Sequence, residues 1–167
     1  MRLDERLDSI VRDVLAPSVA IGNTRRAALY RRLGIEVGER TVLTPNLSLW
    51  PGEVTIGQDC FINRHCVFDP GSASIVIEDG VTLGVGVVLA ANTHEIGPTE
   101  KRARGNKSSS IRIGRGSWLG ARVVVLPGRT VARGCILGAG AVLTRDTSAD
   151  GVYVGVPARR VRDLPSS

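Results

Sequence analysis

His94 is the residue of this 167-residue chain that is best placed to transfer a proton. It lies in the segment LAANTHEIG (89–97), where a polar, charged and aperiodic stretch begins (96–110, IGPTEKRARGNKSSS). That stretch predicts a projecting loop, and loops longer than about 12 residues in compact domains are usually functional or disordered. A histidine at the start of such a loop would be held by the last ordered strand, while the loop itself could move over the site. This placement suits a general base near pH 7. The other histidine, His65, lies within INRHCV and is expected to be structural.

A six-residue repeat predicts the scaffold that holds His94. An apolar residue followed by a small or polar one recurs at fifteen positions: Val37, Leu43, Leu49, Ile56, Ile62, Phe68, Ile77, Leu83, Leu89, Ile113, Leu119, Val125, Val131, Leu137 and Leu143. Grouped in threes, the hexads are interrupted only after a third one, by one residue before Ile56, three before Ile77 and eighteen before Ile113. If three hexads make one triangular coil, all insertions leave from the same corner of a prism.

The hexads predict an all-β fold, a parallel β-helix of about five hexapeptide-repeat coils over residues 35–167. The leading apolar residue of each hexad would point inward and stack on its equivalents about 4.8 Å away in adjacent coils. The composition agrees, since 43% of residues are hydrophobic, only 4% are aromatic, and there are 20 glycines for tight corners. The domain would include a projecting loop at 95–112 and a C-terminal tail at 155–167.

The first 34 residues have a different pattern, which predicts a helical cap over the open end of the prism. Apolar residues from Leu3 to Leu15 recur at spacings of three and four, so we expect an amphipathic helix that ends before Pro17. We expect a second helix from Thr24 to Leu33, with Thr24 as N-cap and Gly34 as C-cap.

Charge and composition exclude several classes of function. The net charge is +6 and all but two of the 22 basic residues are arginine, but they are scattered and aromatic residues are few, so we expect no nucleic-acid partner. An anionic small ligand such as a phosphate-bearing cofactor fits the positive charge better. No apolar run is long enough for a membrane span, and the N-terminus MRLDERLDSI is unlike a secretory signal. Three cysteines without metal or redox spacing favour a reduced, cytoplasmic setting and no metal.

Beyond the repeats, the ordered motifs THEIG, SWLGARVVVLPG, GAGAVLTRD and GVPARRVR resemble the hexapeptide-repeat O-acetyltransferases. The resemblance extends from about Val54 to Arg162 and is greatest to the maltose, galactoside and nodulation-factor acetyltransferases. It implies a left-handed β-helix, a homotrimer with active sites between subunits, and acetyl-CoA bound in the groove between adjacent prisms. It also implies that His94 is the catalytic base. Glu95, Asp69 or a backbone carbonyl could each hold the far nitrogen of its ring.

The same resemblance assigns binding residues on both sides of His94. Asn63 matches an asparagine that contacts the acceptor, and Asp69 lies near the position of an acceptor-binding carboxylate. The positions that match contacts to acetyl-CoA are Trp118, Ala121, Ala139, Thr144, Arg145, Arg159 and Arg162. Arg160 would be an extra, solvated cation.

The function that follows is acetyl transfer from acetyl-CoA to a hydroxyl of a sugar, a glycan precursor or a glycosylated metabolite. The alternatives are a xenobiotic or antibiotic acetyltransferase on the same scaffold, and a non-catalytic β-helix scaffold. A γ-type carbonic anhydrase is excluded, because it needs three histidine ligands for each metal and the chain has two histidines.

Overall fold

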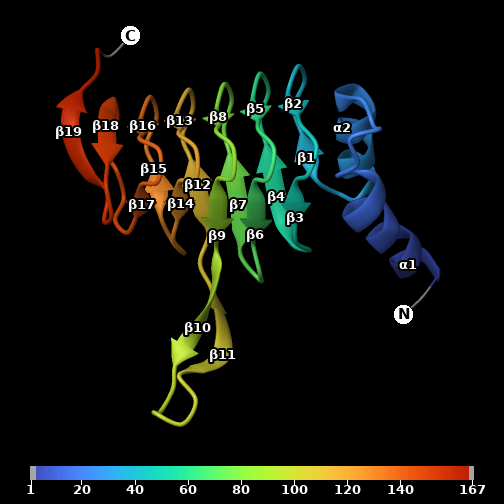
Figure 1. Cartoon of the computed structure of the whole chain (residues 1–167), viewed down its shortest axis with the longest axis horizontal. Coiled ribbons are helices and arrows are strands. Elements are labelled where there is room, and N and C mark those ends of the chain that lie inside the picture. Colours follow the sequence, from blue (N-terminus) through green and yellow to red (C-terminus); the bar gives the residue numbers. More distant parts are fainter. Residues whose placement is uncertain (1–2, 166–167) are drawn as a thin grey trace.

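The computed structural model, which describes residues 3–165, is a triangular prism of short parallel strands (Figure 1). Each coil contributes one strand to each of three sheets, called faces A, B and C. Face A holds β1 (Glu36–Val37), β4 (Glu53–Ile56), β7 (Ser74–Ile77), β12 (Ile111–Ile113) and β15 (Thr130–Val131). Face B holds β2 (Val42–Leu43), β5 (Phe61–Ile62), β8 (Thr82–Leu83), β13 (Trp118–Leu119) and β16 (Ile136–Leu137). Face C holds β3 (Ser48–Leu49), β6 (Val67–Asp69), β9 (Val88–Ala90), β14 (Val124–Val125) and β17 (Val142–Leu143).

These strands form five coils, numbered 1 to 5 from the N-terminal end, as the repeat predicted. The three edges of the prism are named AB, BC and CA after the faces that meet there. At the C-terminal end, face B continues with β18 (Gly151–Val154) and the antiparallel β19 (Arg159–Asp163). The tail that was expected after residue 155 therefore contains an ordered edge strand.

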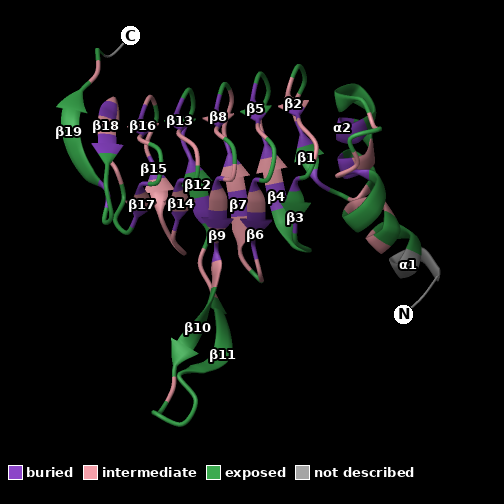
Figure 2. Cartoon of the chain, viewed as in Figure 1, coloured by how far each residue is buried: buried purple, intermediate pink, exposed green. Residues whose placement is uncertain are grey.

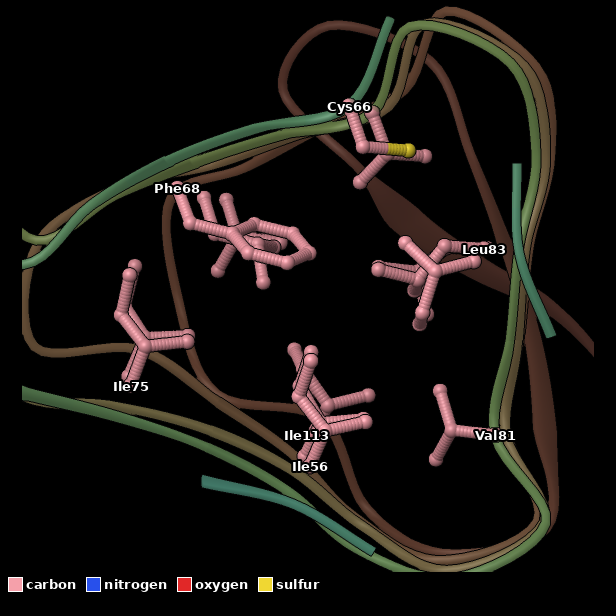
Figure 3. Packing of buried hydrophobic residues seen from close by; sticks show 14 of the residues in the cluster. Ile56, Cys66, Phe68, Ile75, Val81, Leu83 and Ile113 are labelled. Atoms are coloured by element: carbon pink, nitrogen blue, oxygen red, sulfur yellow. The ribbon is translucent and has the colours of Figure 1, made fainter. Parts of the chain in front are cut away.

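One inward side chain from each strand forms the core. All fifteen leading residues of the hexads are buried, with at most 8% of each exposed, which confirms the repeat. Figure 3 shows Ile56 and Ile113 stacked on one side of the triangle, with Leu83 and Phe68 facing them from the other two sides. Cys60, Cys66 and Cys135 are buried and unpaired in the same core.

All three insertions lie at the CA edge, as the sequence predicted. They connect β3 to β4, β6 to β7 and β9 to β12, so each joins face C of one coil to face A of the next. The longest insertion projects from the prism, as expected, but it has a regular structure that its aperiodic sequence did not predict. Its residues pair as an antiparallel hairpin of β10 (Asn92–Ile96) and β11 (Ala103–Ser108) that projects away from the prism (Figure 1).

The outward side chains differ among the three faces. Face A presents Glu36, Thr55, Val76, Arg112 and Thr130, a ladder that is polar or charged except at Val76. Face B presents Val42, Phe61, Thr82, Trp118, Ile136 and Val152. Face C presents Ser48 followed by Val67, Val88, Val124 and Val142. Two faces of the prism are therefore largely apolar toward the outside, and one is not.

The N-terminal residues form helices at the open end of the prism. They are α1 (Leu3–Ile10), continued by the π-helical turn η1 (Val11–Leu15), and α2 (Asn23–Arg32). The first helix ends before Pro17, as expected, and α2 packs against β1 and β2, whose outer edges would otherwise be bare.

The caps of α2 differ in part from the expectation. Thr24 is not the N-cap, because the helix begins one residue earlier, after Gly22. At the other end, Leu33 is the C-cap and Gly34 follows it with φ 82°. The backbone amides of Gly34 and Ile35 donate to the carbonyls of Arg31 and Tyr30, which closes the helix as a Schellman motif.

Arg26 fastens this cap to the prism. Its side chain is fully buried, and its guanidinium donates to the carbonyls of Ala16 at 2.9 Å, Ser18 at 2.8 Å and Leu43 at 2.8 Å. It also donates to Asn23 Oδ1 and to the carbonyl of Ile21. Since Leu43 lies at the end of β2, this single side chain joins α2, the connecting loop and coil 1. Sequence patterns did not reveal this role, because a buried arginine is uncommon.

Tyr30→Phe is expected to remove a loss of stability at high pH. The Tyr30 side chain is fully buried, its hydroxyl has no hydrogen-bond partner among the described residues, and burial raises its pKa to about 12. An unfolded tyrosine ionises near pH 10. The unfolded chain thus loses the proton first, and folding stability falls between pH 10 and 12 by up to roughly 3 kcal/mol.

Urea unfolding midpoints at a fixed protein concentration, measured from pH 8 to pH 11.5, test this prediction. The midpoint should fall more steeply with pH in the wild type and in the control Tyr153→Phe than in Tyr30→Phe. Equal slopes in all three proteins would rule out the buried hydroxyl as the cause.

Candidate functional site

His94 lies on β10, in the hairpin that leaves the CA edge at coil 3. It is opposite Asn106, and the register of the hairpin shifts between His94 and Ile96. Such irregularities turn side chains away from a strict alternation and occur often beside active sites. The ring is exposed, and its Nδ1 lies 3.2 Å from the carbonyl oxygen of Arg104.

That contact decides which of the three alternatives holds the far nitrogen of His94. It is a backbone carbonyl, and neither Glu95 nor Asp69 is the partner. Because a carbonyl only accepts, Nδ1 carries the proton in the neutral ring, and Nε2 is left with a free lone pair. In the neutral ring, Nε2 is therefore the nitrogen that is able to accept a proton.

A groove of about 740 Å³ runs beside the hairpin on the C-terminal side of His94. Its walls are Thr93, His94, Glu95, Ile96, Lys107, Ser109, Leu126, Pro127, Arg129 and Thr144. The groove thus joins His94 to the CA edge at coils 4 and 5. Thr144, one of the predicted donor contacts, lies in it, whereas the adjacent Arg145 is exposed beyond its walls.

Leu126, Pro127, Arg129 and Lys107 are groove residues that the sequence analysis missed. A usable signal existed for two of them, because Leu126 and Pro127 directly follow the inward Val125 and so belong to the CA edge of coil 4. Arg129 is held in place by its Nε donating to the carbonyl of Pro127 at 3.3 Å and by an ion pair with Asp146 at 3.5 Å. The positive charges of Lys107 and Arg129 in the groove favour an anionic ligand.

The foot of the hairpin is fixed by short polar side chains. Ser108 Oγ accepts from the amide of Ser72 at 3.1 Å and donates to Asn92 Oδ1 at 3.2 Å. Gly71 lies against them with φ 59°, and a Cβ at this position would collide with Ser108 Oγ. Asp69 ends β6 just before this turn, at the CA edge of coil 2. It therefore lies on the N-terminal side of the hairpin, opposite to the groove.

Asn63, Ala121 and Ala139 lie along the BC edge, which is a different edge of the same prism. Asn63 follows β5 in coil 2, and its Oδ1 accepts from the amide of Arg64 at 2.8 Å. Ala121 and Ala139 follow β13 and β16 in coils 4 and 5. A Cβ on Gly120 would lie 2.7 Å from the backbone nitrogen of Ala139, so only glycine fits at position 120. Trp118 stands next to this edge on face B, 52% exposed.

Arg159 and Arg162 lie on the exposed strand β19. Arg160 was expected to be a solvated cation, but it is the anchor of that strand. Its guanidinium donates to Asp163 and to the carbonyls of Ser148, Ala149 and Asp150, and it stands 5.8 Å from the Tyr153 ring. All three arginines of this strand are exposed, and Arg159 and Arg162 are the two that these contacts do not hold.

The predicted site residues therefore divide between two edges of the prism. The CA edge carries Asp69, His94, Thr144 and Arg145, whereas the BC edge carries Asn63, Ala121 and Ala139. One chain does not bring the two sets together. Within residues 3–165, no group of three or more His, Cys, Asp or Glu side chains is arranged to hold a metal ion. None of the described helices is long and apolar enough to cross a membrane.

Known proteins provide an independent comparison. The profile of the bacterial transferase hexapeptide (six repeats) matches residues 110–145, and that of the hexapeptide repeat of succinyl-transferase matches residues 53–93. The chain is 35% identical over 118 residues to a Staphylococcus aureus (strain COL) protein classed among acetyltransferases. This match covers 68% of the chain and 58% of that relative, so the chain spans little more than half the length of this relative.

Solved structures match over more of the chain. Galactoside acetyltransferase in complex with coenzyme A superposes with a TM-score of 0.85 at 26% identity, over 97% of this chain and 82% of that one. A hexapeptide-repeat acetyltransferase of Vibrio cholerae complexed with acetyl coenzyme A gives 0.81 at 27% identity, over 97% of this chain and 85% of that one. These matches identify the prism as a left-handed β-helix, as the resemblance implied.

Gly71→Ala is expected to loosen the hairpin without unfolding the prism. The substitution forces a side chain into the left-handed backbone region, at about 1–2 kcal/mol, and also pushes against Ser108. Gly116→Ala is the matched control, because Gly116 has φ 67° but nothing within 4 Å of its Cβ position. Amide hydrogen exchange of residues 92–108 should accelerate about tenfold in Gly71→Ala only. Equal exchange in the two variants would show that Ser108 does not hold the hairpin.

Proposed function

Since the chain belongs to the hexapeptide-repeat acetyltransferases, we propose that it transfers an acetyl group from acetyl-CoA to a hydroxyl of a sugar or glycosylated metabolite. The observation that carries the proposal is the order of the site residues along the prism. The expected acceptor residues Asn63 and Asp69 both lie in coil 2, and His94 leaves from coil 3. The expected donor residues Ala121, Ala139 and Thr144 lie in coils 4 and 5.

This order makes a linear site if the two edges face each other in neighbouring subunits. In a ring whose symmetry axis is parallel to the prisms, each coil lies level with the same coil of the next subunit. The CA edge of one subunit then faces the BC edge of its neighbour, as in a heterologous ring contact. Asp69 comes level with Asn63, and Thr144 with Ala139, while His94 lies between the acceptor and donor halves.

The outer surfaces of the prism support a trimer of this kind. Contact between the BC and CA edges turns face C toward the symmetry axis, and face C carries the ladder of Val67, Val88, Val124 and Val142. The AB edge then lies farthest from the axis. It carries the pairs Arg40–Asp59, Arg115–Asp79 and Arg133–Asp150 between coils, as suits a surface exposed to water.

The hairpin also needs a neighbour. Its strands are exposed throughout most of their length, with Ile96 90% exposed (Figure 2). An isolated two-stranded hairpin is marginal in water. Where it passes the neighbouring BC edge at the level of coil 3, it would lie over face B, whose outward side chains in coils 2 to 4 are Phe61, Thr82 and Trp118. That contact would bury apolar surface on both sides.

The donor half fits coenzyme A chemically. Gly120, Ala121 and Ala139 keep the BC edge free of bulky side chains, so an extended pantetheine arm could lie against the backbone. Lys107 and Arg129 line the groove, and Arg159 and Arg162 are exposed on β19, where they could pair with phosphates. Acetyl-CoA supplies the activated acetyl thioester, and no metal is needed.

The acid–base chemistry is assigned to Nε2 of His94. It accepts the proton of the acceptor hydroxyl while that oxygen forms the new ester bond to the acetyl carbonyl carbon. As the carbon–sulfur bond breaks, the imidazolium returns the proton to the departing thiolate. Throughout, the carbonyl of Arg104 holds Nδ1–H and keeps Nε2 aimed at the reacting atoms. The sugar acceptor is supported by the similarity to galactoside acetyltransferase.

His94→Ala is expected to abolish transfer without weakening donor binding. Loss of a general base costs about 10²–10⁴ in kcat. Acetyl-CoA at 100 times its dissociation constant should still stabilise the variant by about 2.7 kcal/mol. Thiol release with a panel of sugars and glycosides and thermal unfolding with acetyl-CoA provide the two readouts. A fully active variant would disprove the role of His94, and absence of stabilisation in both proteins would refute the donor site.

Mixed oligomers test whether the site spans two subunits. His94→Ala removes the base from the CA edge, and Ala139→Arg blocks the BC edge, so each variant alone should be inactive. In random co-assembly, about a quarter of the contacts join an intact CA edge to an intact BC edge. Co-expressed variants should therefore recover about a quarter of the wild-type rate. No recovery from mixed oligomers of confirmed composition would place the site within one chain.

A further inference from the structure

The helical segment of α1 and η1 carries apolar side chains with no cover on its own chain. Leu7 is 48%, Ile10 49% and Val14 61% exposed, and their spacing of three and four residues places them on one side of the helix. Among the described elements, α1 contacts chiefly η1. Three large apolar side chains on one helix face, beside an otherwise well-buried core, indicate a surface that another element covers.

The segment projects over the CA edge. Arg12 and Asp13 of η1 line a groove of about 310 Å³ together with Trp50 and Pro51, which follow β3 at the CA edge of coil 1. From there α1 slants outward past the end of the prism, toward the side from which the hairpin leaves (Figure 1). Helix and hairpin therefore extend over the same edge at different heights.

The loop between η1 and α2 lies over the BC edge at the same end of the prism. The carbonyl of Pro17 accepts from the amide of Asn46 at 2.8 Å, and Asn46 lies in the BC turn of coil 1. Arg26 holds the same loop through the carbonyls of Ser18 and Ile21. The loop is thus firmly placed, yet it presents Val19 with 77% of its side chain exposed.

We infer that the stripe of Leu7, Ile10 and Val14 packs on Val19 of the neighbouring subunit, so that each N-terminal helix covers part of the N-terminal cap of the next subunit in the ring. The inference rests on the proposed trimer, in which the CA edge of each subunit faces the BC edge of its neighbour and equivalent coils lie at the same level. The helix above one edge then meets the loop above the other. The partner is a second copy of this chain.

Charge supports this partner over an anionic membrane surface. Residues 3–15 contain four acidic and two basic side chains, so the segment carries a net negative charge in a chain of +6. In the same N-terminal cap as Val19, the exposed Arg25 lies in the first turn of α2, where the helix dipole disfavours a cation. An acidic helix from the neighbour would compensate that charge.

Engineered disulfides test the contact directly. The three native cysteines are at most 2% exposed, so mild oxidation reports on introduced pairs. Val19→Cys is combined in turn with Leu7→Cys, Ile10→Cys and Val14→Cys. At least one pair should give bands of two and three linked chains on a non-reducing denaturing gel. The control pair of Ile10→Cys with Val156→Cys should stay unlinked, because Val156 is 71% exposed at the opposite end of the prism.

Each other outcome overturns the inference. A disulfide within one chain would mean that α1 folds back on its own cap. Dimers from Ile10→Cys alone would mean that α1 pairs with its own copy. Unlinked chains that still form active trimers would refute the contact between the helix and the neighbouring cap, and would leave the acetyltransferase proposal intact. A monomeric chain without acetyl transfer would refute both.

Discussion

The stacking of one inward apolar side chain per strand is the constraint on which the rest of the structure depends. Each coil must present three such side chains at fixed spacing, so extra residues can leave only where the coil can open without breaking the stack. In this chain that place is always the CA edge, and the longest departure carries His94. The residue proposed as the general base therefore stands on a hairpin whose two ends join the regular coils of the prism.

Because the coils stack regularly, the position of a residue in the sequence determines how far along the prism axis it lies. Within an uninterrupted run of hexads, residues six positions apart lie on adjacent edges and residues eighteen apart lie on adjacent coils. The residues proposed to bind the acceptor, act as the base and bind the donor can therefore be arranged in a line from coil 2 to coil 5. The cost of this geometry is that the predicted site residues of one narrow prism lie on two separate edges. A site that closes around both substrates needs a second prism, and the apolar outward ladders of faces B and C are what such a partner would cover.

The repeat fixed most of the fold in advance, because burial at every sixth residue depends on local pattern alone. The fifteen inward residues, the five coils and the shared corner of the insertions were all predictable. The pairing of β10 with β11 was not, since its residues are polar on both sides and show no alternation. Arg26, Arg160 and the Gly71–Ser108 contact were missed for a related reason: each acts through long-range contacts to backbone or side-chain groups.

The sequence also did not predict that the site residues divide between two edges, because matching residues to a family does not say on which edge of the prism each one lies. The measurement that tests this account most directly is an experimental structure of the protein with coenzyme A bound. Coenzyme A should lie between the BC edge of one subunit and the CA edge of another along coils 4 and 5, with its sulfur near His94 at the height of coil 3. Coenzyme A held entirely by one chain would contradict the account.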